Sequence, residues 1–227
     1  MTRALLTDIE GTTSSIAFVK EVLFPYSRAR LRDFVRAHAS EPDTRALLDR
    51  LRGETPGSSD DEVAALLCRY IDQDRKHTVL KELQGRIWRH GYEAGDFVAH
   101  VYPDVAPALR RWKSAGLSLH VFSSGSVEAQ KLLFRHSQAG DLTPLFSGFF
   151  DTTTGKKDDP AAYRAITAAI GEPPREIAFL SDTLAELDAA RRAGLLTWRL
   201  DRDGEAGDGP HPCVSSFDQI GLSATGS

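Results

Sequence analysis

Hydrophobic residues at the start of the chain form a short unbroken run rather than a periodic pattern. Residues 4–6 are apolar, Asp8 follows almost at once, and Gly11 comes three residues later. A short apolar run without polar alternation, bounded by a turn residue, is typical of a buried strand that leads into a loop. We therefore predict one buried strand at the N-terminus, with Asp8 at its end.

A long helical region follows this strand. Apolar residues recur three and four positions apart through most of residues 16–95, for example at Val63 and Leu67, which is the periodicity of amphipathic helices. Pro25 is expected to break or kink the first helix, because it cannot donate a backbone hydrogen bond. Residues 53–60 are rich in Gly, Pro and Ser and predict a loop. The region as a whole is predicted to be all helical.

Short apolar runs and helical patterns alternate after Tyr102-Pro103. The predicted order is helix 104–115, strand 117–122, helix 126–136, strand 146–150, helix 160–170, strand 177–180, helix 183–193 and strand 196–200. Alternating strands and helices are typical of a parallel sheet with helices on both faces. The Gly-rich residues after about 203 are expected to be loosely ordered.

The sheet partners of the first strand arrive only after residue 100, so the helices in between must form an insertion. We predict an α/β fold, in which a doubly wound, Rossmann-like parallel sheet carries an inserted all-helical cap. The core is expected to comprise residues 1–15 and 100–227, and the cap residues 16–99. A chain of 227 residues suits such a core with a smaller inserted domain.

Composition excludes several classes of function. The net charge is −4 and charges of both signs are interspersed, which argues against a nucleic-acid partner. The two cysteines, Cys68 and Cys213, belong to no C-x-x-C pair, so we expect neither a disulfide framework nor a zinc site. The N-terminus lacks the apolar core of a signal peptide, and no run of about 18 apolar residues predicts a membrane span. We expect a cytoplasmic monomer that acts on a small molecule and binds no membrane.

Polar residues gather at four predicted strand ends. They are Asp8 and Glu10 after the first strand, Ser123 and Ser124 after the second, Lys156 and Lys157 after the short third, and Asp182 after the fourth. In an open parallel sheet, sites form beyond the carboxyl ends of the strands. We therefore expect these side chains to lie close together.

This set of residues suits phosphoryl transfer. Asp8 can attack phosphorus and form an acyl-phosphate. A hard cation such as Mg²⁺, bound by Asp8 and Asp182, would shield that carboxylate from the charge of the phosphate. Ser123, neighbouring backbone N–H groups and a lysine would hold the phosphate oxygens. Glu10 would exchange protons with the leaving oxygen and then with the attacking water.

Each residue also has a simpler structural explanation. Asp8 and Glu10 would serve as turn residues, and Ser126 or Asp182 would cap the helices that follow them. The two lysines would be solvated surface charges. Only the occurrence of all these groups together, in this order and at strand ends, favours a site.

The four groups resemble the four-motif pattern of haloacid dehalogenase-like phosphohydrolases. Within that superfamily, the runs DIEGTT, SSGSVEAQKLLF and GFFDTTTGKK are similar to the enolase-phosphatase of the methionine salvage pathway, also called acireductone synthase. The resemblance covers residues 3 to about 200. It implies an Mg²⁺-dependent enzyme that enolises 2,3-diketo-5-methylthiopentyl-1-phosphate and then removes the phosphate, which yields the acireductone 1,2-dihydroxy-3-keto-5-methylthiopentene.

The resemblance also implies a role for each motif residue. Asp8 matches the nucleophile and a metal ligand, and Asp182 matches the remaining side-chain metal ligand. Glu10 matches the residue whose backbone carbonyl binds Mg²⁺ while its side chain carries out proton chemistry. Ser123 and Ser124 match positions that contact substrate.

Other matches are less direct. Most phosphatases of the superfamily have Asp at the position of Glu10. Glu186 is implied to hold a metal-bound water. The lysine loop reads GKKDDP, and its spacing from Tyr163 makes Lys157 the catalytic and phosphate-binding lysine, while Lys156 replaces a histidine.

Some alternatives remain open from the sequence. The base for enolisation is either Glu10 or a residue of the cap. The function is that of the enolase-phosphatase, or of an Mg²⁺-dependent phosphatase for another small metabolite. A non-catalytic binding module would be expected to have lost Asp8 or Asp182, and both are present.

Overall fold

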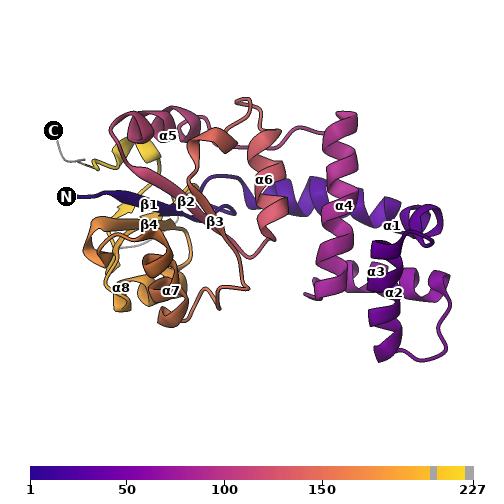
Figure 1. The fold of residues 1–227 in the computed structure, drawn as a ribbon. Coiled ribbons are helices and arrows are strands. Elements are labelled where there is room, and N and C mark those ends of the chain that lie inside the picture. Colours follow the sequence, from indigo (N-terminus) through magenta and orange to yellow (C-terminus); the bar gives the residue numbers. More distant parts are fainter. Residues whose placement is uncertain (205–208, 223–227) are drawn as a thin grey trace. The chain divides into compact units, whose positions relative to one another are not determined.

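The chain consists of two compact units in a computed structural model that describes residues 1–204 and 209–222 (Figure 1). The core unit combines Met1–Ile16 with the described part of Ala99–Ser227. The helical unit is the continuous segment Ala17–Val98. The core unit is therefore built from two stretches of chain that are distant in sequence.

A six-stranded, wholly parallel sheet forms the centre of the core unit, in the order β3-β2-β1-β4-β5-β6. The strands are β1 Ala4–Thr7, β2 Ser118–Phe122, β3 Gly148–Phe150, β4 Ile177–Ser181, β5 Leu196–Leu200 and β6 Cys213–Val214. β1 lies in the middle, because Thr7 pairs with Val121 of β2 on one side and with Leu180 of β4 on the other. The predicted doubly wound α/β fold is confirmed.

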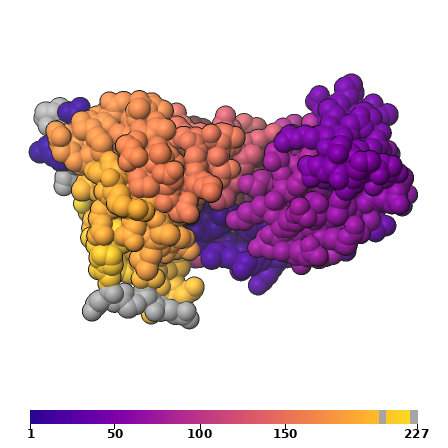
Figure 2. Space-filling view, turned by 90° about the horizontal axis from the view of Figure 1, so that it is seen from below, coloured from indigo at the N-terminus to yellow at the C-terminus, as the bar shows by residue number. Residues whose placement is uncertain are grey.

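Helices cover both faces of this sheet. They are α5 Val105–Ser114, α6 Val127–Arg135, α7 Pro160–Ile170 and α8 Leu184–Arg192, with short 3-10 turns at Thr143–Leu145, Pro174–Glu176 and Phe217–Gln219. Figure 1 shows α5 on one face and α7 and α8 on the other. Tyr163 of α7 and Leu187 of α8 pack with Phe179 of the sheet in one buried cluster. Each such side chain stabilises the fold by about 1.5–3 kcal/mol through burial. Figure 2 shows the outer surface of α7 and α8 in orange.

The helical unit contains only helices among its elements. They are a π-helical segment Phe18–Leu23, then α1 Phe24–His38, α2 Pro42–Glu54, α3 Asp60–Asp72 and α4 Thr78–Ala94. Its own core is fully buried and includes Leu31, Leu48, Leu67 and Leu83, one from each α-helix. The helical periodicity of the sequence therefore corresponds to apolar faces that meet in one core.

Two local features of the helical unit differ from the prediction. Pro25 was expected to break or kink the first helix, and no break is present, because helical structure runs without a gap from Ile16 to His38. Pro25 lies at the second residue of α1, directly after the π-helical turns, where a missing amide hydrogen costs least. The predicted loop is also shorter than 53–60. α2 continues through Glu54, and Ser59 begins α3 with a capping box.

The chain after residue 203 was predicted to be loosely ordered, and this was wrong for residues 209–222. Cys213–Val214 form β6 on the edge of the sheet, and Phe217 is fully buried. His211 is also buried, with one ring nitrogen 2.8 Å from Thr197 Oγ1 of β5 and the other 3.1 Å from an Asp188 oxygen of α8. Residues 205–208 and 223–227, to which the same prediction applied, lie outside the described residues.

Cys68 and Cys213 are free thiols, the first buried in α3 and the second exposed at the start of β6. Among the described helices, none combines the length and the apolar character that a membrane crossing requires.

Candidate active site

Asp8 follows β1 at the centre of the sheet edge. Its amide donates to the carbonyl of Leu180, which continues the pairing of β1 with β4 for one more residue. The residue is only 3% exposed, so its carboxylate is largely removed from water. A buried carboxylate requires charged or polar partners to remain ionised.

Lys157 provides the nearest of those partners. Its ammonium nitrogen lies 2.6 Å from Asp8 Oδ1 and 2.7 Å from Glu186 Oε2, and the residue is 8% exposed. Burial acts to lower the pKa of Lys157, but the two carboxylates outweigh it, and the pKa is raised above its usual value. Lys157 is therefore a permanent positive charge at the centre of the site. Lys156, the neighbouring candidate, is exposed.

The loop around Lys157 is held by α7. Tyr163, which is fully buried in that helix, donates its hydroxyl hydrogen to the Lys157 carbonyl at 2.8 Å. Gly155 packs closely on the same helix, since a Cβ there would lie 2.8 Å from Cβ of Ala162. Asp159 caps α7 by accepting from the Ala161 amide. These contacts determine which of the two adjacent lysines turns inward.

Asp182 follows β4 and faces the loop after β1. Its amide donates to Thr12 Oγ1 at 3.1 Å. A Cβ on Gly11 would lie 2.1 Å from Asp182 Oδ2, and Gly11 has a φ of 70°, so this position requires glycine on both counts. Burial and the nearby Asp8 carboxylate raise the pKa of Asp182. The carboxylates of Asp8 and Asp182, which repel each other, therefore lie at the same edge of the sheet.

Glu186 lies on the first turn of α8 and contacts protein groups, while its expected contact with a metal-bound water stays a prediction. Its Oε2 contacts Lys157 and accepts a hydrogen bond from Ser181 Oγ at 3.0 Å. Burial and the Asp8 charge raise the pKa of Glu186 to about 7, although Lys157 opposes this shift. The side chain thus helps to hold Lys157 beside Asp8.

The loop after β2 begins at the same edge. The Ser123 amide donates to the carbonyl of Phe150, and Ser123 Oγ accepts from the Gly125 amide at 3.2 Å. Ser123 is buried and Ser124 is half-buried. Gln130, buried on α6, donates to the carbonyls of Gly125 and Phe150 at 2.8 Å each. Gln130 therefore ties the end of β3 to this serine loop.

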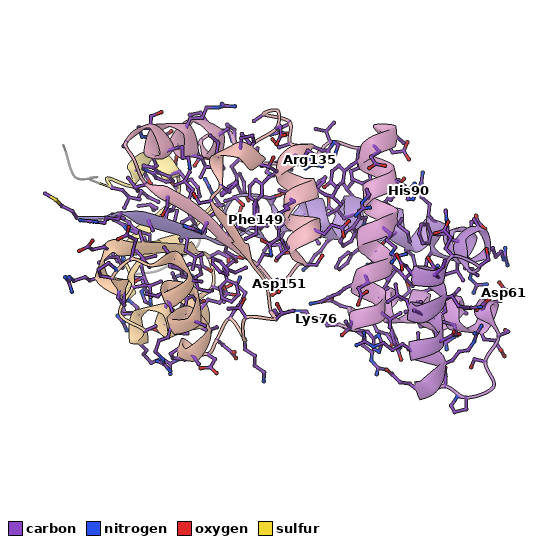
Figure 3. All side chains as sticks on the ribbon, viewed as in Figure 1. Asp61, Lys76, His90, Arg135, Phe149 and Asp151 are labelled. Carbon is purple, nitrogen blue, oxygen red and sulfur yellow. The ribbon has the colours of Figure 1, made fainter. Side chains whose placement is uncertain are left out.

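The start of α6 is fixed from β3 as well. Asp151, labelled in Figure 3 just beyond β3, accepts a hydrogen bond from the Val127 amide at 3.2 Å. Ser126 caps the same helix by accepting from the Ala129 amide. The first turn of α6 thus has two polar partners, which keeps the serine loop in one conformation.

Glu10 lies in the turn that joins Asp8 to the helical unit. The amides of Thr12, Thr13 and Ser14 all donate to the Ile9 carbonyl, which closes the chain into a compact turn. Glu10 is half-buried and forms a bridge with Ser14. The structure therefore keeps Glu10 within two residues of Asp8 on an ordered turn.

Comparisons with known proteins agree with this geometry. A family model described as haloacid dehalogenase-like hydrolase matches residues 2–194. A protein of Methylococcus capsulatus named Enolase-phosphatase E1 is 56% identical over 222 residues, which cover 97% of this chain and 98% of that protein. A protein of Alcanivorax borkumensis with the same name is 53% identical over 225 residues, which cover 98% of this chain and 99% of that protein. The chain belongs to the enolase-phosphatase family of haloacid dehalogenase-like hydrolases. The resemblance of the sequence motifs to this family is confirmed.

A solved structure shares the fold of this enolase-phosphatase family member. The UTR4 protein, or Unknown transcript 4 protein, of Saccharomyces cerevisiae is 34% identical to this chain and aligns with a TM-score of 0.84. The alignment covers 97% of this chain and 100% of that one. The shared fold therefore extends over both units.

Membership of this family implies a divalent cation, and the residues present fit one. Asp8 and Asp182 offer hard oxygen donors at adjacent strand ends, and their mutual repulsion is what a cation would relieve. Within residues 1–204 and 209–222, no three His, Cys, Asp or Glu side chains form a metal-binding group. The carboxylate oxygens of Asp8 and Asp182 suit a hard cation that prefers oxygen ligands.

Several residues that shape this enolase-phosphatase site were missed from the sequence. Thr12 holds the Asp182 amide, Tyr163 holds the Lys157 loop, and Gln130 holds the serine loop. Arg202 contacts the Thr12 carbonyl from beyond β5. The first three stand inside or beside the motif runs of the sequence, whereas Arg202 stands just after the last predicted strand, 196–200, and outside every motif run.

Proposed function

We propose that this chain is the bifunctional enolase-phosphatase of methionine salvage. It converts 2,3-diketo-5-methylthiopentyl-1-phosphate to 1,2-dihydroxy-3-keto-5-methylthiopentene and phosphate, through an aspartyl-phosphate on Asp8. The observation that carries the phosphatase step is the contact of 2.6 Å between the Lys157 ammonium and the buried Asp8 carboxylate. The identity to Enolase-phosphatase E1 along nearly the whole chain supports the enolase step.

In the first half of phosphoryl transfer, a carboxylate oxygen of Asp8 forms a bond to phosphorus while the bond from phosphorus to the substrate oxygen breaks. Lys157 holds Asp8 Oδ1 in position and places a positive charge where the phosphoryl oxygens gather charge. Ser123 and Ser124 bind the same oxygens through their side chains. The side chain of Glu10 gives a proton to the leaving oxygen.

In the second half, water attacks the phosphorus of the aspartyl-phosphate and the Asp8 carboxylate is released. Glu10, now ionised, takes the proton from that water. Glu186 keeps Lys157 at the Asp8 carboxylate throughout, through its contact of 2.7 Å. The enzyme is thereby returned to its starting state with one phosphate formed.

The cation that we propose is Mg²⁺, held by the carboxylates of Asp8 and Asp182 and by the backbone carbonyl of Glu10. When bound, it would offset the charge of the phosphate and polarise the substrate ketone for enolisation. The base for enolisation is Glu10 or a side chain of the helical unit. We propose that the helical unit acts as a cap that selects the methylthio tail, and that the enzyme is a cytoplasmic monomer without a nucleic-acid or membrane partner.

Product identification tests this function. The purified protein is mixed with the diketo phosphate and Mg²⁺, and ³¹P and ¹H NMR follow phosphate and acireductone. We expect both products from the natural enzyme, and neither after exhaustive chelation or in Asp8→Asn, whose amide cannot attack phosphorus. Release of phosphate from other small phosphate esters but not from the diketo phosphate would assign the chain to a different metabolite. Undiminished turnover after chelation would remove the cation from the mechanism.

A further inference from the structure

Arg202 reaches the catalytic loop from a segment that carries no catalytic residue. It stands two residues beyond β5, and its side chain is 6% exposed. Its Nε and Nη2 both donate to the carbonyl of Thr12, at 3.0 and 2.6 Å. A guanidinium that donates two hydrogen bonds to one carbonyl oxygen holds that peptide in a fixed orientation.

The guanidinium is itself held from several sides. Its Nη1 donates to Asp104 Oδ2 at 2.8 Å and to the Ser215 carbonyl at 3.1 Å. Its central carbon lies 4.2 Å from the ring centre of Tyr102 and 5.0 Å from that of Phe217. A guanidinium close to two aromatic rings is attracted by both and has less freedom to rotate. Arg202 is thus a rigid support rather than a mobile surface charge.

Asp104, which binds the Arg202 guanidinium, is itself held by other groups. Its Oδ2 also accepts from the Phe217 amide at 2.6 Å and from Ser216 Oγ at 3.2 Å. Burial acts to raise the pKa of Asp104, but the Phe217 amide and Arg202 outweigh it and the pKa is lowered, so the carboxylate is charged at neutral pH. Asp104 therefore links the start of α5 to the C-terminal segment, and the same carboxylate binds Arg202.

The peptide that Arg202 holds connects the two carboxylates of the site. Thr12 accepts the Asp182 amide with its side chain while its carbonyl binds Arg202. Gly11, the residue before it, lies so close to Asp182 Oδ2 that a methyl group would not fit. The next carbonyl, that of Thr13, accepts from the Tyr102 amide at 3.0 Å. A shift of this loop would therefore change the spacing between Asp8 and Asp182.

We propose that Arg202 is a positioning residue for phosphoryl transfer: through the Thr12 carbonyl it sets the spacing of the Asp8 loop against Asp182. The inference rests on the proposed roles of Asp8 and Asp182 as cation ligands. Its side-chain donors are directed to Thr12, Asp104 and Ser215, so in this proposal Arg202 acts through the loop and not on the reacting groups. Loss of the support removes no catalytic group but changes the spacing of the two carboxylates, which weakens cation binding and misdirects the attack on phosphorus.

The test compares Arg202→Gln with Trp112→Phe. Arg202→Gln removes the pair of bonds to Thr12 and the charge beside Asp104. Trp112→Phe is the matched control, because Trp112 is buried in α5 and packs on Phe217 with ring centres 5.4 Å apart, so it weakens the same region from outside the loop. Calorimetric unfolding gives the Tm of each variant. Titration calorimetry then measures Mg²⁺ affinity without substrate, and phosphate release from the diketo phosphate at saturating Mg²⁺ gives kcat and KM, both well below the lower Tm.

We expect Arg202→Gln to weaken Mg²⁺ binding and to lower kcat, each by about 10- to 100-fold, with KM changed by less than about threefold. Trp112→Phe should match the natural enzyme in all three quantities, whatever its Tm. Arg202→Lys keeps the charge beside Asp104, but a lysine has no planar pair of donors for the Thr12 carbonyl. This variant should therefore lose part of the Mg²⁺ affinity and part of kcat. It is also the variant to measure if Arg202→Gln does not fold.

Two results would overturn the inference while leaving the function intact: folded Arg202 variants with natural Mg²⁺ affinity and kcat, or equal losses in Trp112→Phe. A natural enzyme that neither binds Mg²⁺ nor releases phosphate would instead overturn the proposed function, and the role of Arg202 with it.

Discussion

The buried histidine of β2 makes the stability of the core unit depend on pH. His120 is 7% exposed, and its Nε2 lies 3.2 Å from Ser118 Oγ. Its Nδ1 is buried without a hydrogen-bond partner in the described structure, and it faces Gly148 so closely that a Cβ there would lie 2.8 Å away. Burial, and to a lesser degree the charge of Lys113, lowers the pKa of His120 from 6.5 to about 4.

The sign and size of the effect follow from this shift. The folded state favours the neutral imidazole, so the stabilisation that His120 contributes is complete above pH 6.5 and is lost as pH falls toward 4. Each tenfold difference in proton affinity is worth about 1.4 kcal/mol, which gives roughly 3 kcal/mol for the whole window and about 2 kcal/mol between pH 8 and pH 5. That amount is a large part of the stability of an ordinary domain.

The assay is urea unfolding of the natural protein, His120→Leu and His120→Gln at pH 8, 6.5 and 5. Hydrogen exchange of the β1 and β2 amides reports on the core unit separately from the helical unit. Both variants lack the titrating group, so each should lose about 2 kcal/mol less than the natural protein between pH 8 and pH 5. The same pH dependence in all three proteins would refute the reasoning. Different slopes for the two variants would show that packing, and not titration, is being measured.

Two further predictions concern the site itself. Gly11→Ala should abolish phosphate release, because its methyl group would occupy the position of Asp182 Oδ2. Gly140→Ala is the control, since Gly140 also has a positive φ but open space around it; this variant should cost about 1 kcal/mol of stability in urea unfolding and keep its activity. Lys157→Ala should lower kcat for phosphate release at least about 100-fold, whereas Lys156→Ala, at an exposed position, should leave it unchanged; equal losses from both lysines would contradict the geometry.

The parts of the fold that could be predicted from the sequence are those in which local pattern and tertiary role agree. β4 is buried at every residue, and its unbroken apolar run predicted it within one residue. α7 was predicted with its observed bounds, because Pro160 begins it and Gly171 ends it in the left-handed conformation. β6 was missed because two residues carry no periodicity. Its position depends on pairing with Arg199 and Leu200 of β5.

The same division applies to the site. Asp8 and Asp182 were found because they end buried strands, which is visible in the sequence. Which of the adjacent lysines turns inward depends on the loop that Tyr163 holds, and no local pattern shows that. Arg202 could not be found, since a single arginine beyond the last predicted strand is ordinarily a surface charge. Its burial depends on Asp104, which comes from another part of the chain.

The central place of β1 has a consequence for biosynthesis. Its first residue, Ala4, pairs with Ser118 on one side and with Ile177 on the other, so the first strand to leave the ribosome gains its second neighbour only with the fourth strand. Until β4 has been synthesised, β1 has an unpaired edge, and such edges invite association with other nascent chains. The helical unit, whose contacts lie within Ala17–Val98, can form in the meantime. One edge of β1 therefore stays unpaired until residues 177–181 have been synthesised.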